Sequence, residues 1–303
     1  MPEPTALNDN DWERLLDRIK KGRCTPFLGA GVNGSILPGA RKIAEDWAAG
    51  SQYPLKDNYD LTRVAQYVAI KSKDPMWHKD LMQRLVQEKL DEANLVEELT
   101  KPENPLATLA SLPIPVYMTT NYDDLLVQAL KLRGKDPILE LCAWNNVVAK
   151  KHRSVLKGRG RITPTKDRPV VFHLHGHKDT PESLVLTEDD YLDFLIEVSK
   201  DQDLLPARIQ EALSSSSLLF IGYRLADMNF RVLFRGLVNS KPGALRYMSL
   251  AVQLPPEEGT EQERLNIQNY LDQYFDNVQV KVYWGKAENF IEELRQRWEQ
   301  FEK

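Results

Sequence analysis

The sequence predicts an α/β fold in which helices cover both faces of a mainly parallel sheet. Short apolar runs alternate with longer amphipathic stretches along the 303 residues, a pattern typical of strand–helix repeats. Several apolar runs end in glycine or small polar residues, and ligands bind at such strand ends in parallel sheets. With 42% hydrophobic and 28% charged residues, the chain has ordinary globular composition. We expect one domain over residues 1–303, with a helical insertion at residues 60–110.

The first half of the chain opens with a helix predicted at residues 9–22, where apolar residues recur at helical spacing from Trp12 to Ile19. Asp9 or Asn10 can cap that helix. Apolar residues at spacings of three and four between residues 60 and 110 predict the helical insertion. The other predicted elements are a strand ending in glycines at 24–31, a helix at 40–50, a strand, turn and helix at 114–130, and a strand at 137–142.

The second half begins with a polar connection at residues 150–168. Its basic part, Lys150 to Arg161, is interpreted as a solvated loop, with contact to a partner or a phosphate as the alternative. Strand-like and helix-like patterns then continue to alternate. The predicted elements are a strand at 168–177, a short strand leading into a helix at 183–198 capped near Thr187, a helix at 203–216, a strand, loop and helix at 217–238, a strand at 246–254, a helix at 257–275, a strand at 278–284 and a helix at 286–301.

Composition and charge exclude several classes of protein. A net charge of −4 and a pI of about 5.8 give no broad attraction for nucleic acid, so we expect no direct nucleic-acid binding. The two cysteines, Cys24 and Cys142, cannot form a disulfide framework or a four-cysteine zinc site. The sequence has no apolar run of about eighteen residues, and its N-terminal residues lack the pattern of a secretory signal. We therefore expect a cytoplasmic protein with no membrane span.

Three of the five histidines, His173, His175 and His177, occupy alternate positions in the strand predicted at 168–177. Alternate side chains of a strand share one face, so the row could be a metal site, a catalytic site or a matter of packing. No acidic partner pattern follows it, and we expect no metal. His175 is the best candidate for a general base, because it precedes a glycine that lets a ligand approach and because histidine titrates near neutral pH.

The first predicted strand ends in the glycine turn "FLGAGVNGS", with Gly29, Gly31 and Gly34. Glycines let a backbone approach a phosphate, and the helix that follows offers unpaired amides. The register of the three glycines differs from the GxGxxG fingerprint. A plain strand–helix turn therefore stays open as the alternative.

Two further strand ends carry polar side chains. Asn121 and Asp123 in "TTNYDDLL" can cap the following helix, or Asn121 can present its amide to a substrate hydroxyl or a water. Asp227 and Asn229 in "FIGYRLADMN" can also be helix caps, or they can contact a ribose or an adenine. Because all these motifs follow predicted strands, they agree with one binding site at the edge of the sheet.

Together these motifs resemble the sirtuin family, and most closely the sirtuin-like domains of bacterial antiphage defence systems. The GAG turn, TTNYD, the HG pair and GYRLADMN occur in the family's order, and "LTEDDY" and "YWGKAENFIEEL" fit the same branch. The resemblance spans roughly Phe27 to Glu293. The chain departs from protein-deacetylating sirtuins by lacking the four zinc-binding cysteines and a GIPDFR-like segment. These departures disfavour deacylation and indicate a zinc-less branch.

The resemblance implies a Rossmann-like fold with NAD as the substrate. Asn121 would match the family's asparagine beside the nicotinamide ribose, and His175 its general base. His173 and His177 are then structural or supporting residues. The implied NAD-binding residues are Gly29, Ala30, Gly31, Asn33, Thr120, Asp123, Gly222, Tyr223, Asp227 and Asn229.

The implied activity is hydrolysis of NAD⁺ to nicotinamide and ADP-ribose, in an effector of antiphage defence that is inactive until a signal arrives. The implied partners are further copies of the chain, or a defence protein such as an ATPase or an Argonaute-type protein. The helical insertion is a candidate contact surface. The alternative is a sensor or assembly module that binds NAD or ADP-ribose without turnover.

Overall fold

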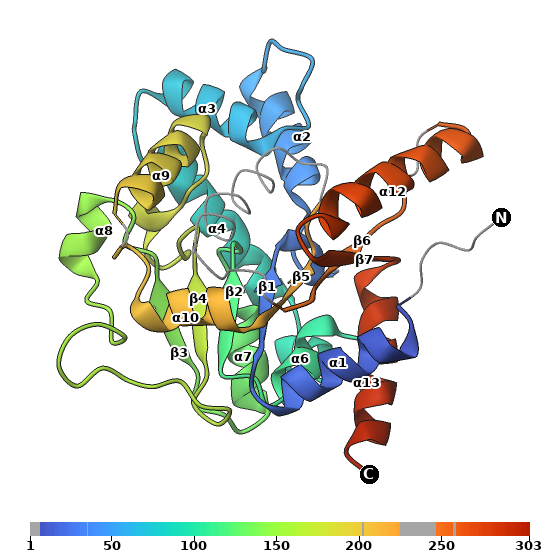
Figure 1. Cartoon of the computed structure of the whole chain (residues 1–303). Coiled ribbons are helices and arrows are strands. Elements are labelled where there is room, and N and C mark those ends of the chain that lie inside the picture. The colour runs from blue at the N-terminus through green and yellow to red at the C-terminus, as the bar shows by residue number, and fades with distance from the viewer. Residues whose placement is uncertain (1–6, 35, 202, 225–246, 257–258) are drawn as a thin grey trace.

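The computed structural model describes residues 7–34, 36–201, 203–224, 247–256 and 259–303 (Figure 1). Within these residues, seven parallel strands form one sheet in the order β3-β4-β2-β1-β5-β6-β7. The predicted parallel α/β fold is confirmed. The strands are β1 (Cys24–Leu28), β2 (Val116–Thr119), β3 (Ile138–Leu141), β4 (Val170–His173), β5 (Ser217–Ile221), β6 (Ser249–Gln253) and β7 (Val280–Trp284).

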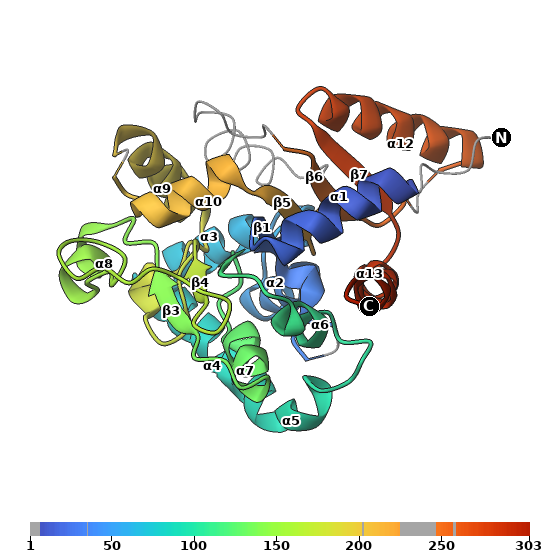
Figure 2. The ribbon, with the colours of Figure 1, turned by 60° about the horizontal axis from the view of Figure 1, so that its bottom comes forward.

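Helices cover both faces of this sheet, with α10 and α12 on one side and α6, α7 and α13 on the other (Figure 2). Neighbouring strand residues alternate between the two cores: Tyr117 faces the core with α13, and Met118 the core with α10. The helices are α1 (Asp9–Lys20), α2 (Ala40–Ser51), α3 (Leu61–Ser72), α4 (Trp77–Glu92), α5 (Leu95–Glu98), α6 (Pro105–Ser111), α7 (Leu125–Leu132), α8 (Asn146–Lys151), α9 (Glu188–Lys200), α10 (Ala207–Ser215), α12 (Glu261–Asp276) and α13 (Ala287–Phe301).

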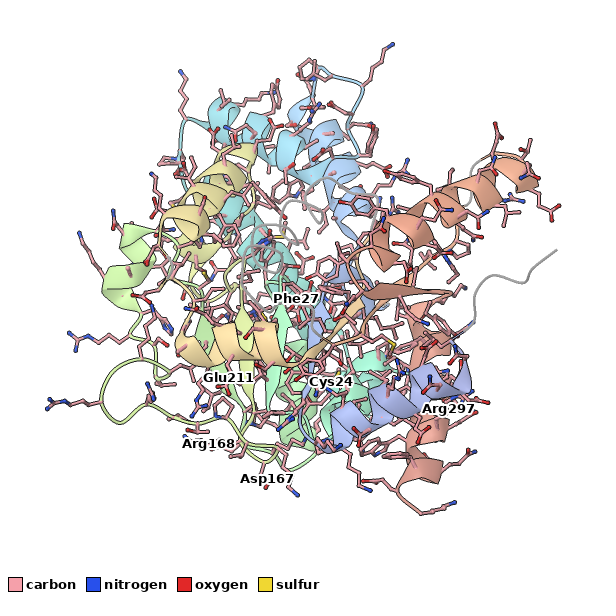
Figure 3. The ribbon with its side chains drawn as sticks, viewed as in Figure 1. Cys24, Phe27, Asp167, Arg168, Glu211 and Arg297 are labelled. Carbon is pink, nitrogen blue, oxygen red and sulfur yellow. The ribbon has the colours of Figure 1, made fainter. Side chains whose placement is uncertain are left out.

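Apolar side chains fill the centre of the sheet, and charged side chains lie outside it. Phe27 lies in the middle of the molecule and is 1% exposed, whereas Arg168 and Arg297 lie near its edge (Figure 3). No helix of the described residues is both long enough and apolar enough to cross a membrane.

Several predicted details are wrong. Asn8, rather than Asp9 or Asn10, caps α1, because its side chain accepts from the amide of Asp11. The short strand expected before α9 is an extended loop after the 3₁₀ turn η2 (Pro181–Ser183), tied back by one hydrogen bond from Val185 N to His175 O at 3.0 Å. Thr187 does cap α9, as predicted.

The order of the strands creates a switch point between β1 and β5. After β1 the chain moves to β2 on one side, whereas after β5 it moves to β6 on the other. The connections that follow the two strands therefore run in opposite directions, and a crevice at such a point is the usual ligand site of these sheets. Helices α2, α3 and α4 lie beyond these strand ends (Figure 1), and α2 packs on α3 through an apolar cluster formed by Ala44, Ala48, Val64 and Val68.

Candidate functional site

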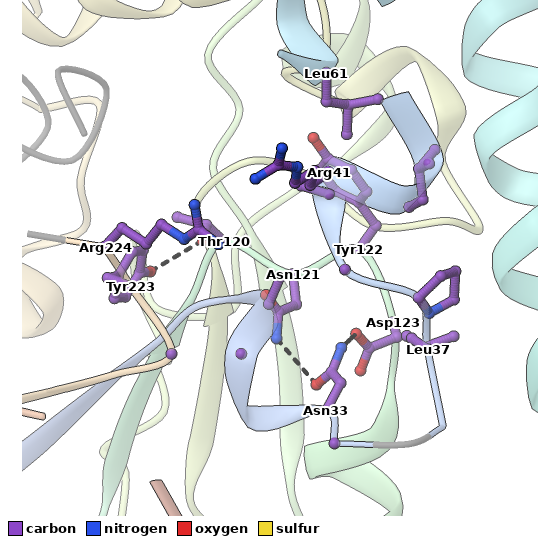
Figure 4. Close-up of a pocket in the computed structure, with 18 of the residues that line it drawn as sticks. Asn33, Leu37, Arg41, Leu61, Thr120, Asn121, Tyr122, Asp123, Tyr223 and Arg224 are labelled. Carbon is purple, nitrogen blue, oxygen red and sulfur yellow. Dashed lines mark hydrogen bonds between the residues drawn. The ribbon is translucent and has the colours of Figure 1, made fainter. Parts of the chain in front are cut away.

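A cavity of about 880 Å³ lies at this switch point. The turns after β1, β2 and β5 form one wall, and apolar residues of the helices beyond them, such as Ile43, Leu61 and Val86, form another. Figure 4 shows the strand-end side chains gathered around Asn121. The predicted site residues that line the cavity are Ala30, Gly31, Asn33, Thr120, Asn121, Asp123, His175, Gly222 and Tyr223.

Among the predicted site residues that the structure describes, Gly29 does not line it. Gly29 lies behind the wall, where its carbonyl oxygen accepts a hydrogen bond from Asn121 Nδ2 at 3.2 Å. Asp227 and Asn229 fall outside the described residues, so their roles stay predictions.

The glycines of the two turns are required by the close approach of one backbone to the other. Gly29 N donates to Ile221 O at 2.9 Å, and Gly31 N donates to Gly222 O at 3.1 Å. A Cβ on Gly31 would lie 2.9 Å from the Cα of Gly222, closer than real contacts allow. These glycines are therefore needed for the packing of the two turns, and a contact of the turn with a phosphate stays a prediction.

Tyr223 joins the ends of three strands. Its hydroxyl donates to Leu28 O at 2.9 Å and lies 3.0 Å from the hydroxyl of Thr120. The ring also packs against Phe27, with 5.8 Å between centroids. Tyr223 thereby has a structural role at the edge of the cavity, and this role is independent of any contact with a ligand.

Asn121 is held by a buried chain of polar side chains (Figure 4). Its Nδ2 donates to Asn33 Oδ1 at 3.1 Å, and Asn33 Nδ2 donates to Asp123 Oδ2 at 2.7 Å. Asp123 Oδ1 accepts from Leu125 N at 3.0 Å, so Asp123 also satisfies an amide at the start of α7. Burial raises the pKa of Asp123 to about 6.

His175 lies in an aromatic environment. Its ring meets Tyr191 and Phe194 edge-on, with centroids 5.0 and 5.2 Å apart, and Nδ1 is 3.4 Å from the Tyr191 hydroxyl. Nε2 is buried without a hydrogen-bond partner among the described residues. Burial lowers the pKa of His175 to about 3. The expectation that His175 titrates near neutral pH is therefore wrong for this conformation, in which the ring is neutral.

Helix α9 carries Tyr191 and is anchored to α3 and α4 by polar contacts. Lys79 of α4 pairs with Asp190 at 2.7 Å, and both side chains are largely buried. Gln66 of α3 exchanges two hydrogen bonds with Asp189, at 2.8 and 3.1 Å. These contacts fix the first turn of α9, and with it the ring beside His175.

The expected row of three histidines is not a strand face. Strand β4 ends at His173, and the chain turns at Gly176 with a φ of 88°. His173 and His177 stack edge-to-face at 4.9 Å away from the cavity, and His173 Nδ1 is 3.0 Å from Asn121 O. In the described part of the chain, no three His, Cys, Asp or Glu side chains are grouped to hold a metal ion.

The cavity residues that sequence reasoning missed include Arg41, Tyr191 and Arg224. The two arginine side chains extend on the side of Asn121 opposite to Asn33 (Figure 4). Arg41 pairs with Glu45 at 3.0 Å, whereas Arg224 makes no ion pair with any described residue. Arg224 and Tyr191 lie within the motifs GYRLADMN and LTEDDY. Their place in these motifs is the sequence feature that could have indicated them as residues of the site.

A family model described as "SIR2-like domain" matches residues 115–275, which contain β2 to β6 and most of the cavity's polar side chains. The chain belongs to the SIR2-like family. The resemblance seen in the sequence is thereby confirmed.

Curated relatives of the SIR2-like chain carry related names. "NAD(+) hydrolase ThsA" of Enterococcus faecium is 28% identical over 221 residues, covering 72% of this chain and 40% of the relative. The protein of the same name from Cytobacillus dafuensis is 25% identical and covers 83% of this chain and 47% of the relative. "Defense-associated sirtuin 2" of Bacillus subtilis is 30% identical, with 73% and 20% covered. The SIR2-like chain thus spans less than half the length of these relatives.

The buried histidines predict how the stability of the SIR2-like chain depends on pH. Burial lowers the pKa of His173 to about 3, so only the unfolded chain takes up this proton as the pH falls below about 6.5. The stability is full above that pH and declines below it, by up to about 1.4 kcal/mol per pH unit for one proton. In His173→Gln the decline between pH 6 and pH 4.5 should be shallower by that amount. Urea unfolding at several pH values measures it, and equal slopes in the two proteins would contradict it.

Proposed function

We propose that this chain hydrolyses NAD⁺ at the nicotinamide–ribose bond to give nicotinamide and ADP-ribose. The observation that carries the proposal is that Asn121 and His175, from different strand ends, line one cavity at the switch point of the sheet. The names of the ThsA relatives support the same reaction. The cavity volume of about 880 Å³ is of the size that protein ligand sites have.

The reaction needs little acid catalysis from the protein. The ring nitrogen of NAD⁺ is already cationic, so nicotinamide leaves with both electrons of the bond to the ribose. Water adds to the sugar carbon and loses one proton, which balances the equation as NAD⁺ and water giving nicotinamide, ADP-ribose and a proton. The protein must hold the ribose, place the water and accept a proton, and positioning supplies a large part of such catalysis.

The two catalytic candidates fit these tasks. The carboxamide of Asn121 can hold a hydroxyl or a water. The neutral ring of His175 can take a proton at Nε2, which has no hydrogen-bond partner among the residues that the structure describes. Because burial keeps the pKa of His175 at about 3, the free site is a weak base. The diphosphate of NAD would bring negative charge into the cavity and raise that pKa, which makes the ring a better base in the complex.

A direct assay tests the activity. The purified chain is incubated with NAD⁺, and nicotinamide and ADP-ribose are followed by chromatography, with binding followed by calorimetry. Release of both products supports hydrolysis. Tight binding without product over hours would instead support the sensor or assembly module.

Arg224 is expected to contribute to NAD binding through the diphosphate, because its guanidinium reaches the cavity without an acidic partner among the described residues. Arg224→Ala should raise KM by about tenfold with a smaller change in kcat, as expected for the loss of one charge-assisted contact. Arg168→Ala is the matched control, since Arg168 pairs with Asp136 far from the cavity. An unchanged KM in Arg224→Ala would contradict the assignment.

The proposal extends to a role in antiphage defence, since relatives include a defence-associated sirtuin. Uncontrolled NAD⁺ cleavage would harm the host cell, so we expect restraint by self-assembly or by a partner protein, with the helical insertion as the contact surface. The native mass in solution, and nicotinamide release with and without the products of neighbouring genes, test this part.

A further inference from the structure

We propose that Asp123 is a positioning residue. Acting through Asn33, it fixes the Asn121 carboxamide so that the carbonyl oxygen Oδ1 faces the cavity as a hydrogen-bond acceptor. The consequence for catalysis rests on the proposed function, but the orientation itself does not. It assigns Asp123, which also lines the cavity, the role of holding Asn33 and Asn121 in place.

Asp123 determines which groups in this chain of hydrogen bonds donate and which accept. An ionised carboxylate can only accept hydrogen bonds. Its Oδ1 is used by the amide of Leu125 at 3.0 Å, and its Oδ2 lies 2.7 Å from Asn33. Asn33 must therefore turn its NH₂ group toward Asp123.

The orientation of the Asn33 amide determines the orientation of the Asn121 amide. With its NH₂ group directed at Asp123, Asn33 presents only its carbonyl oxygen to Asn121, 3.1 Å away. Asn121 must therefore donate a hydrogen bond to it from its own NH₂ group. The backbone carbonyl oxygen of Gly29 can also only accept, and it lies 3.2 Å from the same nitrogen. It therefore requires the same orientation of the Asn121 amide.

Both donors of the Asn121 amide are thereby used inside the protein. Its Oδ1 accepts no hydrogen bond from any residue that the structure describes, while the side chain lines the cavity. The site therefore presents an acceptor and selects a donor, either a ribose hydroxyl or the attacking water. A phosphate or carbonyl oxygen of the ligand would be rejected at this position.

Burial makes this order strict. Asn33 and Asp123 are each 5% exposed, so water cannot substitute for a wrongly paired group. In Asp123→Asn, one amide NH₂ group must face either Leu125 N–H or the NH₂ group of Asn33. The chain can relieve that conflict only by turning Asn33 and Asn121 around, which leaves the Gly29 carbonyl unpaired and an NH₂ group in the cavity.

An exchange of the two side chains provides the sharpest test. In the double variant Asn33→Asp/Asp123→Asn, a carboxylate at position 33 accepts from Asn121 and from the new amide at position 123, whose oxygen accepts from Leu125 N. Charge and size are retained, and only the bond between positions 33 and 123 changes direction. The bonds that Asn121 Nδ2 and Leu125 N donate keep theirs. The single variant Asp123→Asn has the same new amide without this compensation.

We expect Asp123→Asn to lower kcat for nicotinamide release roughly 10- to 100-fold, the effect of one or two misdirected buried hydrogen bonds, with less change in KM. The double variant should recover to within about fivefold of the wild type. A merely structural role for Asp123 would lower stability without this recovery in kcat. A folded double variant that is as slow as Asp123→Asn would overturn the inference.

A second measurement separates this inference from the proposed reaction. In nitrogen-15 spectra, the two Nδ2 protons of Asn121 should exchange slowly with solvent in the wild type and the double variant. They should exchange fast in Asp123→Asn, or in Asn33→Ala if the former does not fold. This pattern in a protein that leaves NAD⁺ intact would sustain the orientation and reject the hydrolase. Fast exchange in the wild type would reject the orientation.

Discussion

Replacing His175 with alanine is expected to abolish nicotinamide release, lowering kcat by about 10²- to 10⁴-fold, the usual contribution of a general base. His175 lines the cavity, and its Nε2 has no hydrogen bond within the described structure to lose. The substitution therefore removes a proton acceptor, and the one hydrogen bond lost with it is the long contact of Nδ1 with the Tyr191 hydroxyl at 3.4 Å. Asn121→Ala should be equally inactive, because it removes the acceptor that holds the hydroxyl or the water. Initial rates at saturating NAD⁺ measure both effects.

His78→Ala is the matched control for His175. Both histidines are almost fully buried, at 4% and 3% exposed, and burial lowers the pKa of each. His78 lies on α4 and does not line the cavity. Both variants lose the packing of an imidazole, but only His175→Ala should lose activity. Similar kcat values in the two variants would show that the loss comes from packing, and full activity in His175→Ala would remove this residue from the mechanism.

The sequence predicted the features that depend on local pattern. Alternation of apolar runs and helical stripes predicted the parallel sheet, and placed Asn121 and His175 after strands whose ends share one edge. Pattern alone could not predict where β4 stops. A φ of 88° at Gly176 turns the chain there, so His175 meets Tyr191 while His173 and His177 meet each other.

Contacts between segments that are distant in the sequence could not be predicted from local pattern. Asn33 and Asp123 are 90 positions apart, and their hydrogen bond depends on β1 and β2 being neighbours in register. From the sequence, Asp123 was both a possible helix cap and an implied NAD contact. The fold shows how one carboxylate can serve α7 and Asn33 at the same time. The burial that lowers the pKa of His175 likewise comes from α9, an element with no local signal at residues 173–177.

Gly222→Ala is expected to cause a large loss of stability. Gly222 has a φ of 83°, and a Cβ there would lie 2.6 Å from Gly29 O and 2.8 Å from Val32 N. Both atoms belong to the backbone, so the turns after β1 and β5 would have to separate. Left-handed strain and overpacking together should lower the free energy of unfolding by roughly 2–4 kcal/mol. Affinity for NAD should fall as well, because both turns line the cavity.

Two other glycines separate the causes of that loss. Gly134 has a φ of 74° but open space around its Cβ, so Gly134→Ala should cost only about 1 kcal/mol for the backbone conformation. Gly50 has neither constraint and lies within α2, so Gly50→Ala should stabilise the protein by about 0.5–1 kcal/mol. Urea unfolding ranks the three variants. If Gly222→Ala costs no more than Gly134→Ala, the turns can move apart freely, and the close approach of β1 and β5 would not be what shapes the cavity.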